Sequence, residues 1–478
     1  MGRDVVITPR AWSHRGEAEL TVRGKPMRVW QGIPGEHARV RVVHEGQHAD
    51  YAVFRESPSP SPRRVEPRCA KYHTCGGCPW MHLDAQGQQD ARVALVRDAL
   101  DAEGLDDVAI DGFVQSPDGQ DDFRWVTKLG VAFSDIGRLR VGAWGRNTRS
   151  VVPIPHCHVV AEPLRRAMAS VAHHVIDLAI PPYDPERDVG VLRAIVLRGA
   201  RSGGGVVVTL VAGRRTRALS DLASLLVGAD AGILGVALHL NDEPGNAIFA
   251  HDEEGRVRTM VLEGDTVLEE ELGGITYLVG PADFFQTNPG MAEVLYRDVV
   301  DQLGLEPGLP FVDLYCGVGG LALLAARTTG WALGVEEGVG AVERAREAAK
   351  RNGLEGVEFF AGRVEEQLDA VRRRLGDAVP VVAVDPARRG LEAGVVDGIS
   401  TLRPARLAYI SCNPRALARD LVALRQQGMR LDTLVLYDMF PNTSHVECLA
   451  VLSTDSEPTS RRAPRRRVVG TSDRRPPE

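Results

Sequence analysis

The chain has 478 residues, which predicts about three domains at roughly 150 residues each, and its 44% apolar and 25% charged residues exclude a largely disordered protein. Its apolar runs are far shorter than the ~20 residues of a membrane-spanning helix, and its N-terminus lacks a signal-peptide core, so we expect a cytoplasmic protein without a membrane partner. The formal net charge of −7 would by itself argue against a nucleic-acid partner.

The N-terminal region, residues 1–57, alternates short β-like runs with glycine-containing turns and shows no helical period. We therefore predict a small β-barrel of the OB type there. Basic residues are concentrated in this part of the chain, because residues 1–68 contain twelve Lys and Arg against eight Asp and Glu. Its surface is thus a candidate for contact with phosphate, despite the overall negative charge.

Three further regions follow along the chain. A Ser- and Pro-rich linker, which forms neither a helix nor a central strand, opens residues 58–284. This region mixes predicted helices, at 84–103 and 160–178, with strands and is expected to be α+β. Residues 285–454 alternate strands and helices and end in a β-hairpin, which predicts right-handed βαβ units and a Rossmann-like α/β domain. The tail, residues 455–478, is rich in Ser, Pro and Arg and is expected to be disordered.

A glycine-rich loop joins the first strand of the C-terminal domain to the helix after it, in the segment Asp313-Leu-Tyr-Cys-Gly-Val-Gly-Gly320. Gly317 in this loop allows a ligand to approach the backbone closely. Glu336 ends the next strand, where a carboxylate can hold both hydroxyls of a ribose. The pair predicts an adenosine cofactor, and S-adenosylmethionine is favoured over NAD because the G-x-G-x-x-G spacing is absent. A simple tight turn between strand and helix is the alternative interpretation.

Three of the seven cysteines, Cys69, Cys75 and Cys78, are spaced C-x5-C-x2-C, and Cys157 can supply a fourth thiolate from a distant loop. Four sulfur ligands suit zinc or an iron–sulfur cluster. A 4Fe-4S cluster is favoured, because zinc sites usually present two C-x2-C pairs and here one ligand is isolated. A radical S-adenosylmethionine enzyme is disfavoured, because it would have C-x3-C-x2-C spacing and would leave one iron without a cysteine.

Three reactive side chains are predicted at the carboxyl edge of the C-terminal sheet. Cys412 lies between a strand and a helix N-terminus, which favours its thiolate, and Asp385 ends the preceding strand. Glu447 is a carboxylate entering an otherwise apolar strand. A thiolate that adds to carbon 6 of uracil makes carbon 5 nucleophilic toward a methyl donor, and a base must then remove the hydrogen of carbon 5. A buried structural cysteine and an exposed turn at Asp385 are the alternative interpretations.

Five motifs in their order along the chain resemble those of the RNA 5-methyluridine methyltransferase family: FQTN at 285–288, DLYCGVGG, VDPARRG, YISCNPRALARDL and DMFPNTSHVE. The resemblance implies an S-adenosylmethionine-dependent enzyme that acts on 23S ribosomal RNA or on the T-loop of tRNA. It implies an RNA-binding TRAM domain at the N-terminus and a 4Fe-4S cluster on the four cysteines. It also implies that four residues line the cofactor site: Gln286, Tyr315, Glu336 and Asp385. Cys412 would be the nucleophile and Glu447 the proton acceptor.

Two positions depart from the family pattern, because Gly320 stands where a side-chain amide is frequent and Arg363 stands near where an Asn or Asp is usual. Candidate RNA contacts are of two kinds, cations for the backbone and aromatic rings for an unstacked base. The cations are Arg124 and Lys128, and the rings are Phe284, Phe285 and Trp80.

We expect a monomer that methylates a uridine of 23S ribosomal RNA, with tRNA as the alternative substrate. A non-catalytic RNA-binding assembly factor is the second hypothesis, because Gly320 and Arg363 remove expected cofactor contacts. An iron–sulfur redox regulator ranks last, because it leaves Cys412 and Glu447 without a role.

Overall fold

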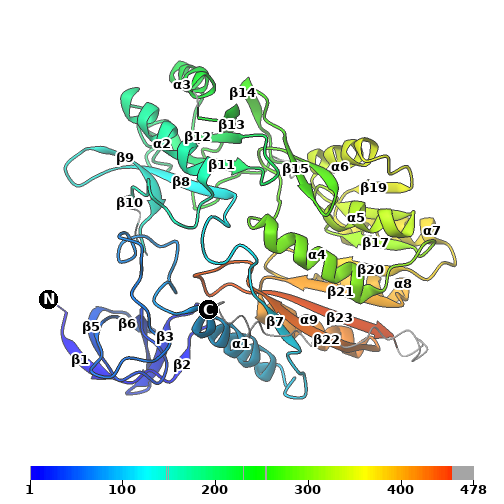
Figure 1. Ribbon diagram of the computed structural model, residues 1–478, viewed down its shortest axis with the longest axis horizontal. Helices are drawn as coiled ribbons and strands as arrows, with labels where there is room; N and C mark the ends of the chain where they lie inside the picture. The colour runs from blue at the N-terminus through cyan, green and yellow to red at the C-terminus, as the bar shows by residue number, and fades with distance from the viewer. Residues whose placement is uncertain (1, 147, 149, 230, 253–255, 455–478) are drawn as a thin grey trace, which may run out of the picture.

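The computed structural model describes residues 2–146, 148, 150–229, 231–252 and 256–454, and the tail predicted to be disordered lies outside these residues. The described chain forms three sheets of six, seven and eight strands, together with a two-stranded hairpin (Figure 1). None of the described helices is long and apolar enough to cross a membrane.

The N-terminal sheet has the strand order β1-β5-β6-β4-β3-β2. Its strands are β1 (Asp4–Ile7), β2 (Ala11–Trp12), β3 (Ala18–Val22), β4 (Lys25–Trp30), β5 (Ala38–Glu45) and β6 (Asp50–Glu56). One face builds a small core of its own, which includes Met27, Val29 and Val40. The sheet curls on itself (Figure 1), but β2 is only two residues long, and the described pairings leave β1 and β2 as edges. The predicted barrel is therefore an open, curled sheet.

The central sheet has the order β10-β9-β8-β11-β12-β13-β14. Its strands are β8 (Val126–Phe133), β9 (Leu139–Trp144), β10 (Val151–Val152), β11 (Leu192–Gly199), β12 (Val206–Ala212), β13 (Ile233–Leu240) and β14 (Met260–Gly264). Helices α2 (Glu162–Asp177) and α3 (Arg217–Gly228) bury their apolar stripes against it; on α2 the stripe includes Leu164, Val171 and Val175. The helix predicted at 160–178 corresponds to α2.

The C-terminal sheet has the order β19-β18-β17-β20-β21-β23-β22-β7. Its C-terminal strands are β17 (Phe311–Leu314), β18 (Ala332–Glu336), β19 (Val357–Ala361), β20 (Val381–Val384), β21 (Arg406–Ser411), β22 (Met429–Tyr437) and β23 (Glu447–Thr454). Strands β17 to β21 are parallel, and β22 and β23 form the predicted closing hairpin. The chain extends the sheet first to one side of β17 and then to the other, which leaves a crevice at the carboxyl ends of these strands.

Helices cover both faces of this sheet, as expected for an α/β fold. One face is covered by α4 (Pro289–Leu303), α5 (Gly320–Thr329) and α6 (Val339–Arg351). The other is covered by α7 (Val364–Leu375), α8 (Ala393–Leu402) and α9 (Pro414–Gln426).

A helix, a strand and a hairpin from before residue 285 also pack with this domain, which the sequence did not indicate. β7 (Gly112–Val114) pairs in parallel with β22 at the edge of the sheet. Helix α1 (Ala85–Ala102) packs beside α9 and contributes Val96 and Leu100 to the core. The hairpin of β15 (Leu268–Leu272) and β16 (Ile275–Val279) packs on α6. A three-residue strand has too few positions to show an alternating pattern, so β7 carries no sequence signal.

Candidate active site

Cys412 and Glu447 lie opposite each other at the carboxyl edge of the C-terminal sheet. Cys412 directly follows β21, and Glu447 is the first residue of β23. The two strands are antiparallel with Ser411 opposite Cys448, so Cys412 and Glu447 are the next pair in the register. Glu447 is 3% exposed, and its Oε1 atom has no hydrogen-bond partner among the described residues. A buried, unpartnered carboxylate oxygen is unfavourable in a folded protein, so this arrangement indicates a functional site.

Arg388, in the loop after β20, controls the charge of this pair. Burial and the charge of Glu447 raise the pKa of Cys412 to about 11, whereas Arg388 lowers it through its own charge and a hydrogen bond. Burial, followed by the charge of Asp385, raises the pKa of Glu447 well above its ordinary value, and Arg388 again opposes the shift. Burial therefore opposes ionisation of both groups, and Arg388 favours it.

The loop after β17 is open on one side at Gly317. This residue has φ of 56°, and a Cβ atom there would meet nothing nearer than the carbonyl oxygen of Phe284 at 3.9 Å. Its N–H donates to Glu336 Oε2 at 3.0 Å, and the N–H of Gly338 donates to Glu336 Oε1 at 2.8 Å. The carboxylate is thus fixed at the end of β18, with lone pairs left for hydroxyl donors. This geometry suits the ribose of an adenosine cofactor.

Three side chains form a second wall of the crevice. Gln286 is 4% exposed, and its Nε2 donates to Asp385 Oδ2 at 3.4 Å. Burial raises the pKa of Asp385 to about 7. Asp313, in β17, accepts from the N–H of Ala322 at 2.8 Å, and burial raises its pKa to about 8. A cationic ligand placed here would favour the charged forms of both carboxyl groups.

Tyr296, on α4, occupies the space beside Gly320. A Cβ atom added at Gly320 would lie 2.8 Å from the Tyr296 hydroxyl oxygen. The tyrosine is 6% exposed and forms a hydrogen bond with Gln286. The departure from the family pattern at Gly320 therefore leaves a polar hydroxyl group, and not a gap, beside the glycine-rich loop.

Tyr315 and Arg363 have different surroundings, although both were considered for the cofactor site. Tyr315 has a left-handed backbone with φ of 67°, which is rare for a bulky residue and is found at functional loops. Its ring is half-buried, and burial raises the pKa of its hydroxyl. The Arg363 side chain is 53% exposed and forms an ion pair with Glu365. Arg363 therefore faces solvent at the start of α7.

The segment 438–446 that leads into Glu447 is held by α1, from a distant part of the sequence. Arg92 is fully buried and donates to three backbone carbonyl oxygens of this segment at 3.0 Å each, those of Phe440, Thr443 and His445. Its guanidinium also lies 3.2 Å from Asp438. These contacts fix the path of the backbone immediately before Glu447.

The four predicted metal-ligating cysteines come from two segments. Cys69, Cys75 and Cys78 lie in one loop, Cys157 lies in another, and all four are half-buried. Burial raises the pKa of Cys78 to about 12; Arg124 lowers it, and the charges of the other three thiols raise it further. Among the described residues, no three of these sulfur atoms lie within 4.8 Å of one another.

The candidate RNA-contacting residues are only partly exposed. Phe284 is 68% exposed, whereas Phe285 and Trp80 are 6% and 1% exposed and belong to the core. Phe285 packs on Tyr277 with 5.5 Å between ring centroids. Burial lowers the pKa of Lys128, and the charges of Arg198 and Arg388 act in the same direction, so Lys128 lies on the Arg388 side of the site.

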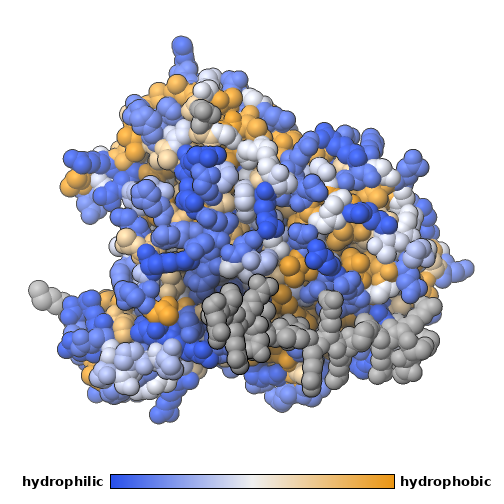
Figure 2. Space-filling view, viewed as in Figure 1, coloured by the Kyte–Doolittle hydropathy of each residue, from blue (hydrophilic) through white to orange (hydrophobic). Residues whose placement is uncertain are grey.

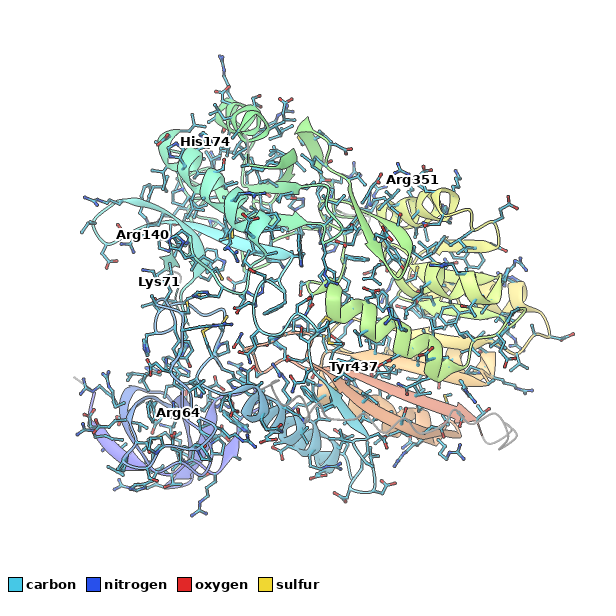
Figure 3. All side chains as sticks on the ribbon, viewed as in Figure 1. Arg64, Lys71, Arg140, His174, Arg351 and Tyr437 are labelled. Atoms are coloured by element: carbon cyan, nitrogen blue, oxygen red, sulfur yellow. The ribbon has the colours of Figure 1, made fainter. Side chains whose placement is uncertain are left out.

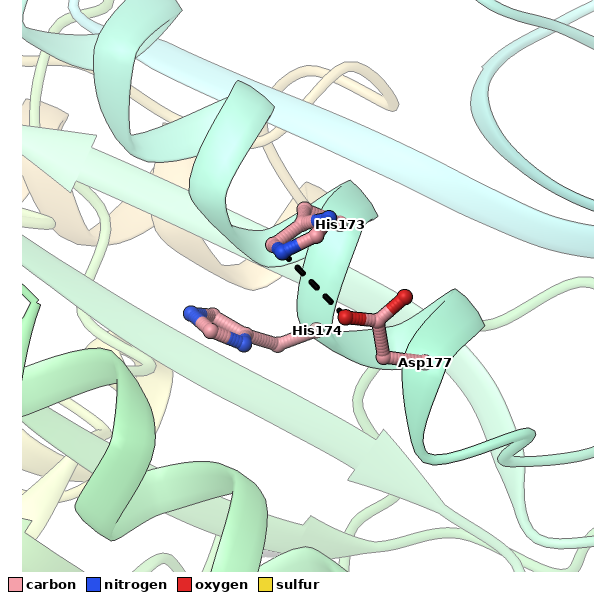
Figure 4. A group of neighbouring side chains, drawn as sticks. All are labelled: His173, His174 and Asp177. Atoms are coloured by element: carbon pink, nitrogen blue, oxygen red, sulfur yellow. Dashed lines mark ion pairs between the residues drawn. The ribbon is translucent and has the colours of Figure 1, made fainter.

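Among the described residues, helix α2 carries three neighbouring side chains of the kinds that bind metals, outside this site: His173, His174 and Asp177. His173 Nε2 lies 3.2 Å from Asp177 Oδ2 on successive turns of the helix (Figure 4), and both side chains are more than half exposed. Such (i, i+4) pairs are ordinary features of a helix surface. The group lies far from Tyr437 of the C-terminal sheet (Figure 3).

Four residues with a place in the site were not assigned roles from the sequence: Asp313, Arg388, Tyr296 and Arg92. Asp313 and Arg388 lie within recognised motifs, and a carboxylate in the buried run FVDL is a signal that could have identified the first. Tyr296 and Arg92 lie on helices with no such signal, because an arginine on a helix is usually exposed.

Known proteins resemble this chain over nearly its whole length. A family model described as tRNA (Uracil-5-)-methyltransferase matches residues 265–455. An uncharacterized RNA methyltransferase of Gloeobacter violaceus is 31% identical over 450 residues, which cover 94% of this chain and 95% of that protein. Another, from Synechocystis sp., is 30% identical and covers 94% and 96%. The solved structure of Pyrococcus abyssi tRNA (uracil-54, C5)-methyltransferase with S-adenosyl-L-homocysteine has the same fold, with a TM-score of 0.71, 24% identity, and coverage of 94% of this chain and 100% of that one.

Proposed function

The chain belongs to the RNA 5-methyluridine methyltransferase family, and we propose that it transfers a methyl group from S-adenosylmethionine to carbon 5 of a uridine in RNA. The observation that carries the proposal is the buried, unpartnered carboxylate of Glu447 opposite the thiol of Cys412. Carbon 5 of uracil becomes nucleophilic when a thiolate adds to carbon 6, and the product forms only when a base removes the hydrogen of carbon 5. A thiol and a carboxylate on facing strands suit both steps.

The residues of the site have separate roles in cofactor binding, nucleophilic addition and proton removal. S-adenosylmethionine supplies a methyl group on a cationic sulfur, and it would be held by Gly317, Glu336, Gln286, Asp385 and Tyr315. The Cys412 thiolate forms a bond to carbon 6, which moves negative charge onto carbon 5. Carbon 5 would then bond to the methyl carbon as the bond between that carbon and the donor sulfur breaks, and the electrons of the broken bond would stay on the sulfur as a neutral thioether. Glu447 then accepts the proton of carbon 5. The electrons of that C–H bond restore the C5–C6 double bond and release the sulfur of Cys412.

Replacing Glu447 by glutamine should trap the RNA on the protein. Without the base, the methylated uridine stays bonded to Cys412, so anaerobically purified Glu447→Gln mixed with S-adenosylmethionine and unmodified total RNA should give a slowly migrating band on a denaturing gel. The band should be absent without S-adenosylmethionine and absent from the Cys412→Ala/Glu447→Gln double variant. If the wild type is active and no band forms, another group removes the proton.

The activity should rise with pH, and Arg388 should set where it rises. Because the pKa of Cys412 is raised to about 11, the thiolate fraction below that pH increases about tenfold per pH unit, and kcat/KM should follow it. Loss of Arg388 removes a cation that lowers this pKa. We expect Arg388→Met to reduce kcat/KM at neutral pH by about tenfold and to move the rising limb to higher pH.

The neighbouring Arg389 provides the matched control for Arg388. Its side chain is 68% exposed and pairs with Glu392 at 3.1 Å. Arg389→Met should therefore keep the wild-type pH–rate profile. An unchanged profile in Arg388→Met would show that this residue does not act on the thiol.

We propose 23S ribosomal RNA as the substrate and retain tRNA as the second candidate. The combination of an N-terminal β domain with four cysteines favours the ribosomal branch of the family. Two findings favour tRNA: the description of the matching family model, and the alignment of the Pyrococcus abyssi tRNA enzyme over 100% of its length. Sequencing the RNA trapped by Glu447→Gln decides between them.

We propose that Cys69, Cys75, Cys78 and Cys157 hold a 4Fe-4S cluster with a structural role, because methyl transfer moves no net electrons. Four cysteine thiolates are the usual ligands of such a cluster. No three of these described sulfur atoms lie within 4.8 Å of one another, whereas thiolates around zinc, with bonds of about 2.3 Å, lie about 3.8 Å apart. Anaerobically purified protein should contain about four iron atoms per chain. One zinc atom per chain in their place would contradict the proposal.

A further inference from the structure

A cleft of about 680 Å³ lies between the N-terminal sheet and the cysteine loop, outside the site described above. We call it the sheet–loop cleft; its walls are β4, β6, residues 64–67, residues 72–74 and the turn after β9. The surface is notched between the lobe of the N-terminal sheet and the central lobe, at the left of Figure 2. Pockets of this size hold small organic groups, and a single nucleotide falls within the range.

Two uncompensated cations face this cleft. Arg64 is neutralised there by Glu36, which it contacts with two nitrogens, and its guanidinium stacks on Phe54 at 3.8 Å. Arg146 and Arg55, in contrast, have no carboxylate ion-pair partner among the described residues. The Nε atom of Arg146 is buried without a hydrogen-bond partner in the described structure. A phosphate would supply the missing negative charge.

The cleft also offers surfaces for a base. Trp30 is half-buried and leaves part of its indole ring accessible, and His73 is exposed. Tyr72 and His82 are hydrogen-bonded to each other at 2.7 Å and buried, so they form the floor. Glu66 is the exposed carboxylate on the rim, where it can accept from N–H groups of a base edge. Aromatic rings beside arginines are the usual means of holding unstacked nucleotides.

Cations act on the active site and on the cysteine loop, and others lie near the cleft. Arg388 acts on Cys412 and on His445, and Arg124 acts on His445 and on Cys78. Beyond the cysteine loop, Lys71 and Arg140 lie on the same flank of the molecule as Arg64 (Figure 3), and both lack a carboxylate partner among the described residues. These cations can contact the phosphates of an RNA strand on this flank.

We propose that the sheet–loop cleft is a second RNA site, which holds one unstacked nucleotide of the substrate with its base against Trp30 and its phosphate at Arg146. The inference rests on the proposed action on RNA. It assigns to the junction of sheet and cysteine loop a role in selecting which uridine reaches Cys412, because a nucleotide held here fixes the register of the strand.

The test uses the anaerobically purified full-length protein and a fluorescein-labelled, uridine-rich single-stranded RNA of about twelve nucleotides. Arg146→Met should raise Kd about tenfold and reduce the slope of log Kd against log salt by about one. Trp30→Leu should raise Kd about tenfold without changing that slope. Arg146→Lys should restore the slope. The matched control is Arg166→Met on α2, where a 59% exposed arginine pairs with Glu162; it should bind like the wild type.

A second readout separates direct contact from a structural role. The same RNA with 4-thiouridine, irradiated on the wild-type protein, should cross-link to the tryptic peptide 29–39 that carries Trp30. Wild-type Kd and slope in both variants, together with no cross-link in this peptide, would overturn the proposal. If the double variant Arg146→Met/Glu447→Gln traps as much RNA as Glu447→Gln does, the cleft does not bind the substrate. The proposed catalytic roles of Cys412 and Glu447 then still stand. If Glu447→Gln traps nothing but Arg146→Met still weakens binding, the second site stands alone.

Discussion

Replacing Cys412 by alanine is expected to abolish methyl transfer, with kcat reduced by about four orders of magnitude or more, the range seen when an essential nucleophile is removed. The loss follows from the chemistry, because without addition at carbon 6 the ring carbon has no negative charge with which to attack the methyl group. The residue is half-buried at a strand end, so a smaller side chain there should leave the fold intact. Single-turnover methyl transfer from labelled S-adenosylmethionine measures the effect.

Cys448 supplies the matched control for that variant. It follows Glu447 in β23, but its side chain points to the opposite face of the strand and is fully buried among core residues. Cys448→Ala should lose some stability and keep kcat near that of the wild type. Full activity in Cys412→Ala would show that the thiol is not needed for methyl transfer. The burial of Glu447 opposite it would then have no explanation in the proposed mechanism.

Replacing Arg92 by methionine is expected to destabilise the protein by about 3–5 kcal/mol, because it leaves Asp438 as a buried charge without its partner. Asp438 is 4% exposed, so water does not replace the lost guanidinium. Three carbonyl oxygens before Glu447 also lose their donor, so kcat should fall together with stability. Urea-induced unfolding and methyl transfer by the fraction that remains folded measure the two effects.

Two further variants separate the charge effect from the positioning effect. Arg92→Met/Asp438→Asn removes the orphaned charge, so it should recover part of the stability while kcat stays low. Arg97→Met, on the same helix, removes a surface ion pair with Asp101 at 3.7 Å and should cost about 1 kcal/mol or less. If the double variant regains full activity, the contacts to the carbonyl oxygens do not position Glu447.

Local patterns were sufficient for the strands and helices of the C-terminal domain after residue 285 and for the residues that end those strands. Alternation of apolar strands with helices predicted the C-terminal α/β sheet, and the position of Glu336 at a strand end follows from that alternation. Cys412 was predicted on its sheet edge for the same reason. What the pattern could not give is the register that places Cys412 opposite Glu447, because that register depends on a hairpin between them.

The residues that sequence reasoning missed act across long distances in the chain. Arg92 contacts the carbonyl oxygen of His445, 353 residues away, and nothing near Arg92 in the sequence distinguishes it from Arg97 on the same helix, whose side chain is 33% exposed. Trp80 was a candidate for stacking on RNA, but its indole N–H donates to the Gly16 carbonyl oxygen at 2.7 Å and its ring is buried. Burial of a large polar or aromatic residue is a tertiary property that local spacing does not report.

Helix α1 and strand β7 are synthesised long before the C-terminal strands and helices on which they pack. The Leu434 N–H donates to Asp111 Oδ2 across 323 residues of sequence. At about 5–20 residues per second, the ribosome needs roughly 16–65 s to make that intervening chain. Val96 and Leu100 of α1 have no folded sheet to cover them during this interval. We therefore expect the nascent chain to keep these two apolar side chains exposed until the C-terminal sheet has been made.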